Sequence, residues 1–269
     1  MRLAEKVVPF YFGSPDKLLF GCYHEPSFER RRKCAVVVCQ PVGHEYINSH
    51  RALRQLAARL SDAGFPVLRF DYYGCGDSSG SREEGTILQW LKDISTAISE
   101  VRSRTAVVQV CLIGLRLGGT LAMIAAAERA DLESMVLWDP VISGKGYLHG
   151  LLRLQEEMLR FRPKPSSAQE PQGYLDVLGF PLSRFFRTEL EKIHLAPIAG
   201  SPAKNALVIQ SDQTAGEANL KEHFSQAEAR LEYQRFDGPQ IWRPTSDGSL
   251  LVPSQILHSI VSWTYRVHP

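Results

Sequence analysis

One stretch decides the fold: VQVCLIGLRLGGTLAMIAAAERA, residues 108–130. Its first half is a continuous apolar run with β-branched residues, which is typical of a strand buried on both faces. Its second half is rich in small and aliphatic residues at helical spacing. Gly114 and Gly118 flank the junction, where the chain must change from strand to helix within a few residues. The stretch therefore predicts a strand, a sharp turn with Arg116 at its tip, and a helix.

Strand and helix patterns alternate along the rest of the chain. Short apolar runs predict strands at 6–12, 17–23, 35–39, 66–70, 106–113, 134–138, 206–210 and 230–236. Helical spacing predicts helices at 49–63, 86–102, 117–129, 215–229 and 253–266. An early antiparallel pair followed by this alternation indicates an α/β fold, with a mostly parallel sheet covered by helices on both faces.

One segment interrupts the alternation. Residues 143–196 are rich in Gly, Pro, Ser and charged residues, and they carry helical patterns of their own at 147–161 and 182–193. The ligand crevice of such a sheet lies at the carboxyl ends of its strands, where an inserted segment is well placed to cover it. We expect a core formed by 1–142 and 197–269, with 143–196 as a lid.

Composition narrows the function classes. The 269 residues are 44% hydrophobic and carry a formal net charge of +2, which indicates a large core and a nearly balanced surface. The basic run at 29–34 is short, so no nucleic-acid partner is expected. The five cysteines show neither metal-binding nor disulfide spacing, so we expect no metal site and a reducing, cytoplasmic location.

Other sequence signals are absent. No apolar stretch approaches the ~20 residues of a membrane span, and the N-terminus has no signal-type apolar core. The glycines of GKGYLHG, residues 144–150, lack the context and the G-K-[ST] ending of a phosphate loop, so no cofactor is expected. Nothing in the sequence fixes the oligomeric state, and a homodimer stays open.

Four motifs carry a family resemblance. The turn at Arg116 has the spacing of G-x-S-x-G, in which the central side chain projects over the carboxyl edge of the sheet. CQPVGHEY (39–46) looks like an oxyanion loop, and FDYYGCGDSSG (70–80) looks like the turn after the fourth strand. LVIQSDQTAGE (207–217) looks like the strand that presents a triad acid, at Asp212. Over nearly its whole length the chain resembles the α/β-hydrolase superfamily, most of all serine-aminopeptidase-like and exosortase-associated hydrolase-like proteins. The resemblance implies an eight-stranded sheet with a lid.

The chain departs from that family at the catalytic triad. In the family a serine attacks, a histidine after the last strand takes its proton, and an acid orients the histidine. Arg116 stands in the serine position, and a guanidinium has no lone pair with which to attack. The loop at 235–253 contains no histidine, and of the eight histidines only His44 falls on a loop of the expected site. Hydrolysis through an acyl-enzyme is therefore not expected.

The resemblance still implies a pair of backbone donors. The N–H of Leu117 and an N–H near Val42 or Gly43 would form the oxyanion hole, and the positive end of the helix from Leu117 points into the same space. Gln240 and Trp242 stand where the histidine loop is expected, as a hydrogen-bonding group and a stacking face, or simply as packing.

Arg116 has two interpretations. It is an anion anchor that binds a carboxylate or phosphate of the ligand through two parallel hydrogen bonds. Alternatively, it forms an internal ion pair with Glu45, Asp212 or Asp139 that plugs the site, because a buried unpaired arginine is very unfavourable.

The acids near the turn have two interpretations each. Glu45, beside His44 on a loop expected to face the turn, either transfers protons or pairs with Arg116. Asp139 ends the strand at 134–138 and is either an alternative triad acid or a structural turn residue before a proline. Asp212 keeps the usual acid position but has no histidine to orient, which favours a structural role or a contact with arginine.

Two function hypotheses follow. In the first, the protein is an enzyme without covalent catalysis: Arg116 and the backbone hole bind an oxygen of an acyl- or carboxylate-bearing metabolite, free or carrier-bound, and Glu45 or His44 moves a proton in an isomerase, lyase or cyclase reaction. In the second, it is an inactive pseudo-hydrolase that binds a ligand or a protein. Hydrolysis by water with Glu45 as base is a further alternative.

The resemblance implies an accessory role in secondary-metabolite or surface-polysaccharide pathways. The apolar segment YLDVLGFPLSRFF, residues 174–186, favours ligand binding and hence the first hypothesis.

Overall fold

The structure is a computed structural model that describes residues 6–27, 31–129, 131–160, 173–195, 202–211, 230–245 and 247–269. The described strands form one eight-stranded sheet and a separate two-stranded hairpin. The large sheet has the order β1-β2-β4-β3-β5-β6-β9-β10, antiparallel at β1, β2 and β4 and parallel from β4 to β10. The α/β prediction, with a mostly parallel eight-stranded sheet, is confirmed.

The strands of the large sheet begin and end close to the predicted residues. Their bounds are β1 Val7–Ser14, β2 Lys17–His24, β3 Cys34–Cys39, β4 Val67–Phe70, β5 Gln109–Leu115, β6 Ser134–Trp138, β9 Asn205–Gln210 and β10 Arg230–Arg235. β3, β5 and β6 are almost wholly buried, which explains why their sequences are continuous apolar runs rather than alternating ones.

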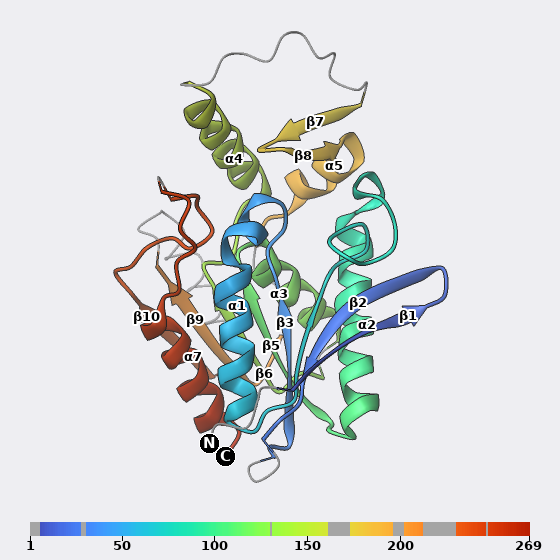
Figure 1. Ribbon diagram of the computed structural model, residues 1–269, viewed down its shortest axis with the longest axis vertical. Coiled ribbons are helices and arrows are strands. Elements are labelled where there is room, and N and C mark those ends of the chain that lie inside the picture. Colours follow the sequence, from blue (N-terminus) through green and yellow to red (C-terminus); the bar gives the residue numbers. More distant parts are fainter. Residues whose placement is uncertain are drawn as a thin grey trace.

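Helices cover the two faces of the sheet (Figure 1). α1 (His44–Asp62) and α7 (Ser254–Val267) lie against one face, and α2 (Ile87–Thr105) and α3 (Leu117–Arg129) lie against the other. Each face has its own apolar core: the first contains Leu56, Trp138 and Trp263, and the second contains Ile94 and Leu121. A short 3-10 helix, η2 (Arg82–Glu84), precedes α2.

The junction between β5 and α3 is as sharp as the sequence predicts. Arg116 is its single turn residue and has a positive φ of 55°, a conformation that non-glycine residues rarely adopt and that needs support from the surroundings. That support includes a hydrogen bond of 3.0 Å from the Arg116 N–H to the carbonyl of Trp138. A Cβ on Gly114 would lie 2.4 Å from the Cα of Gly119, so strand and helix approach too closely for any side chain there.

The segment between β6 and β9 forms a separate layer above the carboxyl ends of the strands (Figure 1). It consists of α4 (Gly144–Leu159), the hairpin of β7 (Tyr174–Val177) and β8 (Phe180–Ser183), and α5 (Arg184–Lys192). The two helices were expected, but the hairpin was not. Leu178 and Gly179 both have positive φ and connect its strands, which is the geometry of a tight two-residue hairpin turn.

One expected boundary is wrong. The helix expected from residue 49 begins at His44, so His44 and Glu45 lie in the first turn of α1 rather than on a loop. Ser49, where the helix was expected to begin, donates its hydroxyl to the carbonyl of Glu45 at 2.7 Å, inside the helix. The turn into the helix is made by Gly43, with φ 63°. The helix expected at 215–229 lies outside the described residues.

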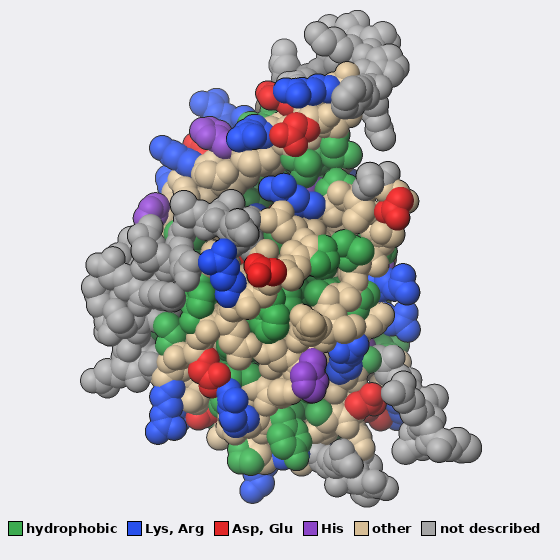
Figure 2. Space-filling view, turned by 90° about the vertical axis from the view of Figure 1, so that its left-hand side faces the viewer, with side chains coloured by type: hydrophobic (Ala, Val, Ile, Leu, Met, Phe, Trp, Pro, Cys, Tyr) green, Lys and Arg blue, Asp and Glu red, His purple; other side chains and the backbone are tan. Residues whose placement is uncertain are grey.

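The surface is of mixed character. On the face seen in Figure 2, Lys and Arg side chains are interspersed with Asp and Glu, and hydrophobic side chains are scattered among them. Among the helices that the structure describes, none is both long and apolar enough to cross a membrane.

Candidate functional site

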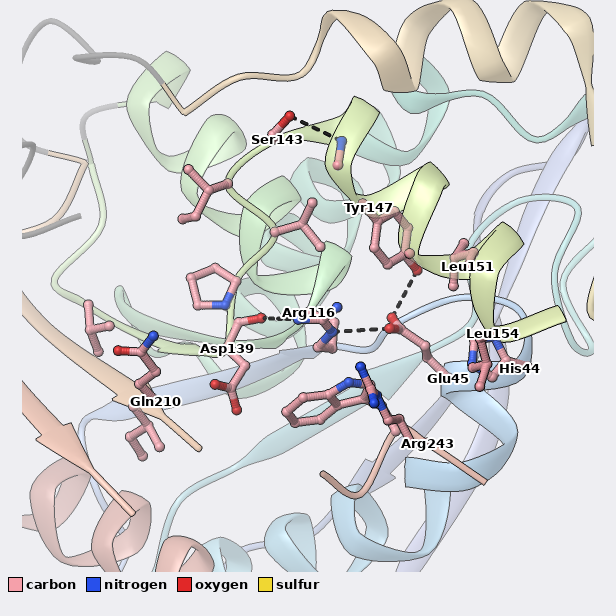
Figure 3. Close-up of a pocket in the computed structure, with 18 residues that line it drawn as sticks. His44, Glu45, Arg116, Asp139, Ser143, Tyr147, Leu151, Leu154, Gln210 and Arg243 are labelled. Atoms are coloured by element: carbon pink, nitrogen blue, oxygen red, sulfur yellow. Dashed lines mark hydrogen bonds and ion pairs between the residues drawn. The ribbon is translucent and has the colours of Figure 1, made fainter. Parts of the chain in front are cut away.

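A cavity of about 350 Å³ lies between the carboxyl edge of the sheet and α4 (Figure 3). Six parts of the chain line it: the first turn of α1, the turn after β5, the end of β6 with the residues that follow it, α4, the end of β9, and the loop after β10. The residues that carry charge or a hydrogen-bonding group into the cavity include His44, Glu45, Arg116, Tyr147, Gln210 and Arg243.

Arg116 lies at the centre of this group. Its Nε donates to Oε1 of Glu45 at 3.0 Å, and Nη1 donates to the backbone carbonyl of Asp139 at 3.3 Å. A guanidinium carries five N–H groups. Within the described part of the chain, the two N–H groups on Nη2 have no hydrogen-bond partner, although 19% of the side chain is exposed. Arg116 is therefore ion-paired and still has donors to offer to a ligand.

Aromatic rings flank the same guanidinium. Its central carbon lies 4.7 Å from the ring centroid of Trp242 and 5.7 Å from that of Tyr147, both within cation–π range. Burial is the largest single effect and acts to lower the pKa of Arg116, but the charge and hydrogen bond of Glu45 and the neighbouring Tyr147 and Asp139 together outweigh it, and the net pKa is raised. Arg116 stays a cation at every pH at which the protein is folded.

Glu45 has both carboxylate oxygens engaged. It is only 2% exposed, and besides the bond from Arg116 it accepts a hydrogen bond of 2.9 Å from the Tyr147 hydroxyl to Oε2 (Figure 3). Burial and the neighbouring Glu45 charge raise the pKa of Tyr147, so the phenol stays protonated and remains the donor. Because Tyr147 lies on α4, this contact ties the layer above the sheet to α1 of the core.

His44 directly precedes Glu45 in the sequence and also lines the cavity. Its Nε2 is buried and has no hydrogen-bond partner among the described residues. Burial lowers the pKa of His44, and the positive charges of Arg116 and Arg243 lower it further against the opposing effect of Glu45. His44 is thus a neutral imidazole at pH 7, with a ring nitrogen that is not used by the fold.

Asp139 contributes to the site through its backbone. It has a positive φ of 44°, and its carbonyl accepts the bond from Arg116. Its carboxylate accepts two bonds from Ser211, at 2.8 Å from the N–H and at 2.5 Å from the hydroxyl. These bonds connect the ends of β6 and β9 and give Asp139 a structural role at the edge of the sheet.

The residues expected to form the oxyanion hole are spread over two places. Leu117 is the first residue of α3, and its side chain is buried in the core. Val42 and Gly43 line a neighbouring cavity rather than the one that contains Arg116. The structure therefore brings Leu117 next to Arg116 but does not bring Val42 or Gly43 into the same cavity.

The loop after β10 differs in detail from the expectation. Trp242 lines the cavity, whereas Gln240 does not, and the carbonyl of Gln240 accepts a hydrogen bond of 3.0 Å from the N–H of Arg243. That turn places the side chain of Arg243 at the cavity, where no role was assigned to it from the sequence. Asp212 lies outside the described residues.

Two contributors were missed at the sequence level, Tyr147 and Arg243. Arg243 had a readable signal, because it is a cation next to Trp242 in the loop where a histidine is expected. Tyr147 had none, because its partner Glu45 is 102 residues away. Among the described residues, no group of three or more His, Cys, Asp or Glu side chains is arranged to bind a metal ion.

Comparison with known proteins agrees with the fold. A family model described as serine aminopeptidase, S33, matches residues 32–173. A 134-residue segment is 34% identical to palmitoyl-protein thioesterase ABHD10, mitochondrial, from Pongo abelii, covering 48% of this chain and 42% of that protein. A 137-residue segment is 28% identical to the monoglyceride lipase of Rattus norvegicus, covering 50% and 43%. The matches thus span less than half the length of these curated relatives.

Solved structures extend the likeness to the whole fold. Est1E of Butyrivibrio proteoclasticus, with ferulic acid bound, superposes with a TM-score of 0.70 at 18% identity, covering 96% of this chain and 98% of that one. Mouse alpha/beta hydrolase domain-containing protein 10 superposes with a TM-score of 0.58 at 16% identity, covering 97% and 99%. At these identities the likeness concerns the fold alone.

Proposed function

The chain belongs to the serine aminopeptidase S33 family of the α/β-hydrolase superfamily, and from that premise we propose that it is an atypical member without covalent catalysis. In this proposal Arg116 replaces the nucleophilic serine and binds the carboxylate, or another acyl oxygen, of a small metabolite. The protein then acts on the bound metabolite by proton transfer, as an isomerase, lyase or cyclase.

One observation carries the proposal: the two N–H groups of Arg116 Nη2 without a partner in the described residues, at a cavity of about 350 Å³. A guanidinium binds a carboxylate through two parallel hydrogen bonds from two different nitrogens, here Nη2 and the second N–H of Nη1. Glu45 at Nε and the Asp139 carbonyl at Nη1 hold the guanidinium, so the arginine is oriented before the ligand arrives, which reduces the entropy lost on binding.

His44 is the group that we assign to proton transfer. The carboxylate of Glu45 already accepts bonds from Arg116 and Tyr147, whereas Nε2 of His44 has no partner among the described residues. The lowered pKa of His44 keeps its imidazole neutral and able to accept a proton. In an isomerisation, His44 would take a proton from the carbon next to the anchored carboxyl or acyl group and return it to another carbon of the ligand as the double bond shifts. In an elimination, the electron pair of the broken C–H bond would form a double bond and expel a leaving group from the neighbouring carbon, and that group would take up the proton from His44.

The layer formed by residues 143–196 is the lid in this proposal, over a core of 1–142 and 197–269. Its contribution is Tyr147, which lines the cavity and reaches down to Glu45. A lid that excludes water strengthens the interaction between Arg116 and an anion, because the local dielectric constant falls. Carrier-bound acyl substrates and an accessory role in a biosynthetic pathway stay as proposals that rest on the family resemblance.

A second candidate function has its own support. The ion pair between Arg116 and Glu45, closed over by Tyr147, also fits a pseudo-hydrolase that binds a ligand without turnover. The two candidates share the anion site at Arg116 and differ only at His44. An enzyme needs the unpartnered Nε2, whereas a binding protein does not.

Isothermal titration calorimetry tests the shared site. We expect short carboxylates to bind the wild-type protein with their uncharged amides binding at least 10-fold more weakly, and we expect Arg116→Lys to lose about 10-fold to 100-fold in carboxylate affinity because a lysine cannot form the two-bond fork. Arg153→Lys, at an exposed arginine of α4 with 78% of its side chain accessible, is the matched control. Equal binding of acids and amides, or unchanged affinity in Arg116→Lys, contradicts the proposal.

A further inference from the structure

A second cavity, of about 240 Å³, lies beside the one that contains Arg116. It is enclosed between the start of α1, the turn after β4 and the layer above the sheet. Its walls are mostly aromatic and aliphatic, and the side chains that contribute most of them are Tyr72, Trp90, Val177, Phe180, Leu182 and Phe186. Neither Arg116 nor Leu117 lines it, so this cavity is displaced from the turn after β5.

Gln40 and Asp71 of the second cavity are bonded to each other, whereas the Tyr72 hydroxyl and Nε2 of His44, which also belong to its lining residues, have no hydrogen-bond partner among the described residues. Gln40 donates from Nε2 to Oδ1 of Asp71 at 2.6 Å, and the N–H of Asp77 donates to Oδ2 of Asp71 at 3.0 Å. Gln40 and Asp71 are only 4% and 7% exposed. At the rim, the guanidinium of Arg82 stacks on the ring of Phe180 at 5.2 Å. The surface of the cavity is nevertheless mostly apolar, which suits an apolar part of a ligand.

The two cavities share three wall residues, His44, Tyr147 and Leu151. Figure 3 shows Tyr147 and Leu151 descending from α4 toward Glu45 and His44. A single hydrogen bond, from the Tyr147 hydroxyl to Glu45, is the polar contact that holds Tyr147 in this wall. Tyr147 thus belongs to the wall that the cavity of Arg116 and the second cavity have in common.

Resting on the proposed function, we infer that the ligand of Arg116 is an amphipathic acid, with its carboxylate at Arg116 and an unbranched apolar chain in the second cavity, and that Tyr147 is the gate between the two. The volume of about 240 Å³ sets an upper limit on the length of that chain. His44, in the shared wall, lies beside the part of the ligand that joins the acid to the chain.

Titration calorimetry with a series of straight-chain carboxylates, from acetate to dodecanoate below their micelle concentrations, tests this inference. Each methylene that enters the second cavity tightens binding by about fourfold, and the gain stops when the cavity is full. Leu182→Trp fills the cavity and moves this plateau to shorter acids. Phe180→Ala enlarges the cavity and moves the plateau to longer acids, which keeps the test valid should one of the two variants fail to fold. Leu88→Trp, the same exchange at an exposed position on α2, retains the wild-type series.

The outcomes separate this inference from the proposed function. If all carboxylates bind through Arg116 with equal affinity whatever their length, the amphipathic ligand is wrong and the anion site stands. If octanol binds as tightly as octanoate, the apolar cavity acts without Arg116 and the inference fails. If no carboxylate binds, the proposed function fails and this inference fails with it. A plateau that moves in opposite directions in Leu182→Trp and Phe180→Ala supports the inference.

Discussion

The guanidinium of Arg116 and the carboxylate of Glu45 share one hydrogen bond, 3.0 Å from Nε to Oε1, rather than a two-bond fork. This single bond neutralises the buried charges and leaves the N–H groups of Nη2 without a hydrogen-bond partner among the described residues. The pair therefore stabilises the fold and keeps a binding edge at the same time. The interpretations of Arg116 as an internal ion pair and as an anion anchor are compatible in this geometry.

Removing one partner of this pair should destabilise the protein. Arg116→Met leaves the Glu45 carboxylate, which is 2% exposed, without its cation, and we expect a loss of about 3 kcal/mol in the free energy of unfolding. The double variant Arg116→Met/Glu45→Gln removes both charges and should regain at least half of that loss. Urea unfolding measures the free energy of unfolding of the wild type, of the single variants Arg116→Met and Glu45→Gln, and of the double variant. Arg153→Met, at an exposed ion pair, is the control and should change it by less than about 0.5 kcal/mol. Additive effects of the two substitutions would show that Arg116 and Glu45 are not coupled.

Acyl-enzyme formation should not occur. Arg116 occupies the serine position of the turn after β5, and residues 235–253 contain no histidine, so the Ser–His pair of the family is missing from the sequence. We expect a fluorophosphonate probe to leave the intact mass unchanged. We also expect Arg116→Ser to remain unlabelled at the probe concentration that saturates an active serine hydrolase, because residues 235–253, where the family carries its catalytic histidine, contain none. Stable labelling of any wild-type serine contradicts the non-covalent mechanism.

Proton transfer through His44 predicts a specific pH profile. The lowered pKa of His44 keeps the imidazole neutral through the physiological range, so turnover of a bound substrate should stay constant above pH 7 and fall only in acid. His44→Gln should lower kcat at least 100-fold while changing the carboxylate dissociation constant by less than about threefold, since the anchor is Arg116. Steady-state kinetics and calorimetry separate the two effects. Carboxylate binding that is lost together with turnover would mean that His44 positions the ligand.

Stability should decrease in acid through a second buried histidine. Burial, assisted by the charge of Arg69, lowers the pKa of His24 to about 3, and Arg69 Nε donates to Nε2 of His24 at 3.0 Å, which requires a neutral ring. The unfolded chain binds a proton at about pH 6.5, so the contribution of His24 is complete above that pH and is lost as the pH falls toward 3. The slope per group reaches about 1.4 kcal/mol per pH unit. Urea unfolding from pH 7 to pH 4 measures it, and His24→Gln should flatten the curve whereas His50→Gln, on the exposed side of α1, should not.

The fold was predictable because its signals are local and repeated. β3, β5 and β6 are buried on both faces, so each is a continuous apolar run, and the turn at Arg116 needs small residues at its two sides. The start of α1 was not predictable from Ser49, because a hydroxyl that caps a helix and one that bonds back to the carbonyl four residues earlier are identical in the sequence. The β7–β8 hairpin was missed because four-residue strands give too short a pattern.

The residues of the site could be predicted only where a short sequence motif contains them. Arg116, Glu45 and His44 follow from two motifs near the carboxyl edge of the sheet. The contact of Tyr147 with Glu45 depends on where α4 lies above the core, which no local pattern determines. Arg243 lines the cavity and Gln240 does not, because the chain turns between residues 240 and 243. Motif spacing in a sequence does not predict which of several neighbouring loop residues faces a cavity.

Gly118 gives the most direct test of the turn that presents Arg116, and Gly150, inside α4, serves as the comparison. A Cβ on Gly118 would lie 2.3 Å from the carbonyl oxygen of Cys39, and backbone at the end of a buried strand cannot move away, so Gly118→Ala should destabilise the protein by at least about 2 kcal/mol. Gly150, inside α4, has nothing within 4 Å of the same position, so Gly150→Ala should instead stabilise by about 0.5–1 kcal/mol through helix propensity. Thermal unfolding reports both with opposite signs. If Gly118→Ala is neutral, α3 does not press against the end of β3, and the positive φ of Arg116 is then held by its hydrogen bond to Trp138 rather than by the close approach of helix and strand.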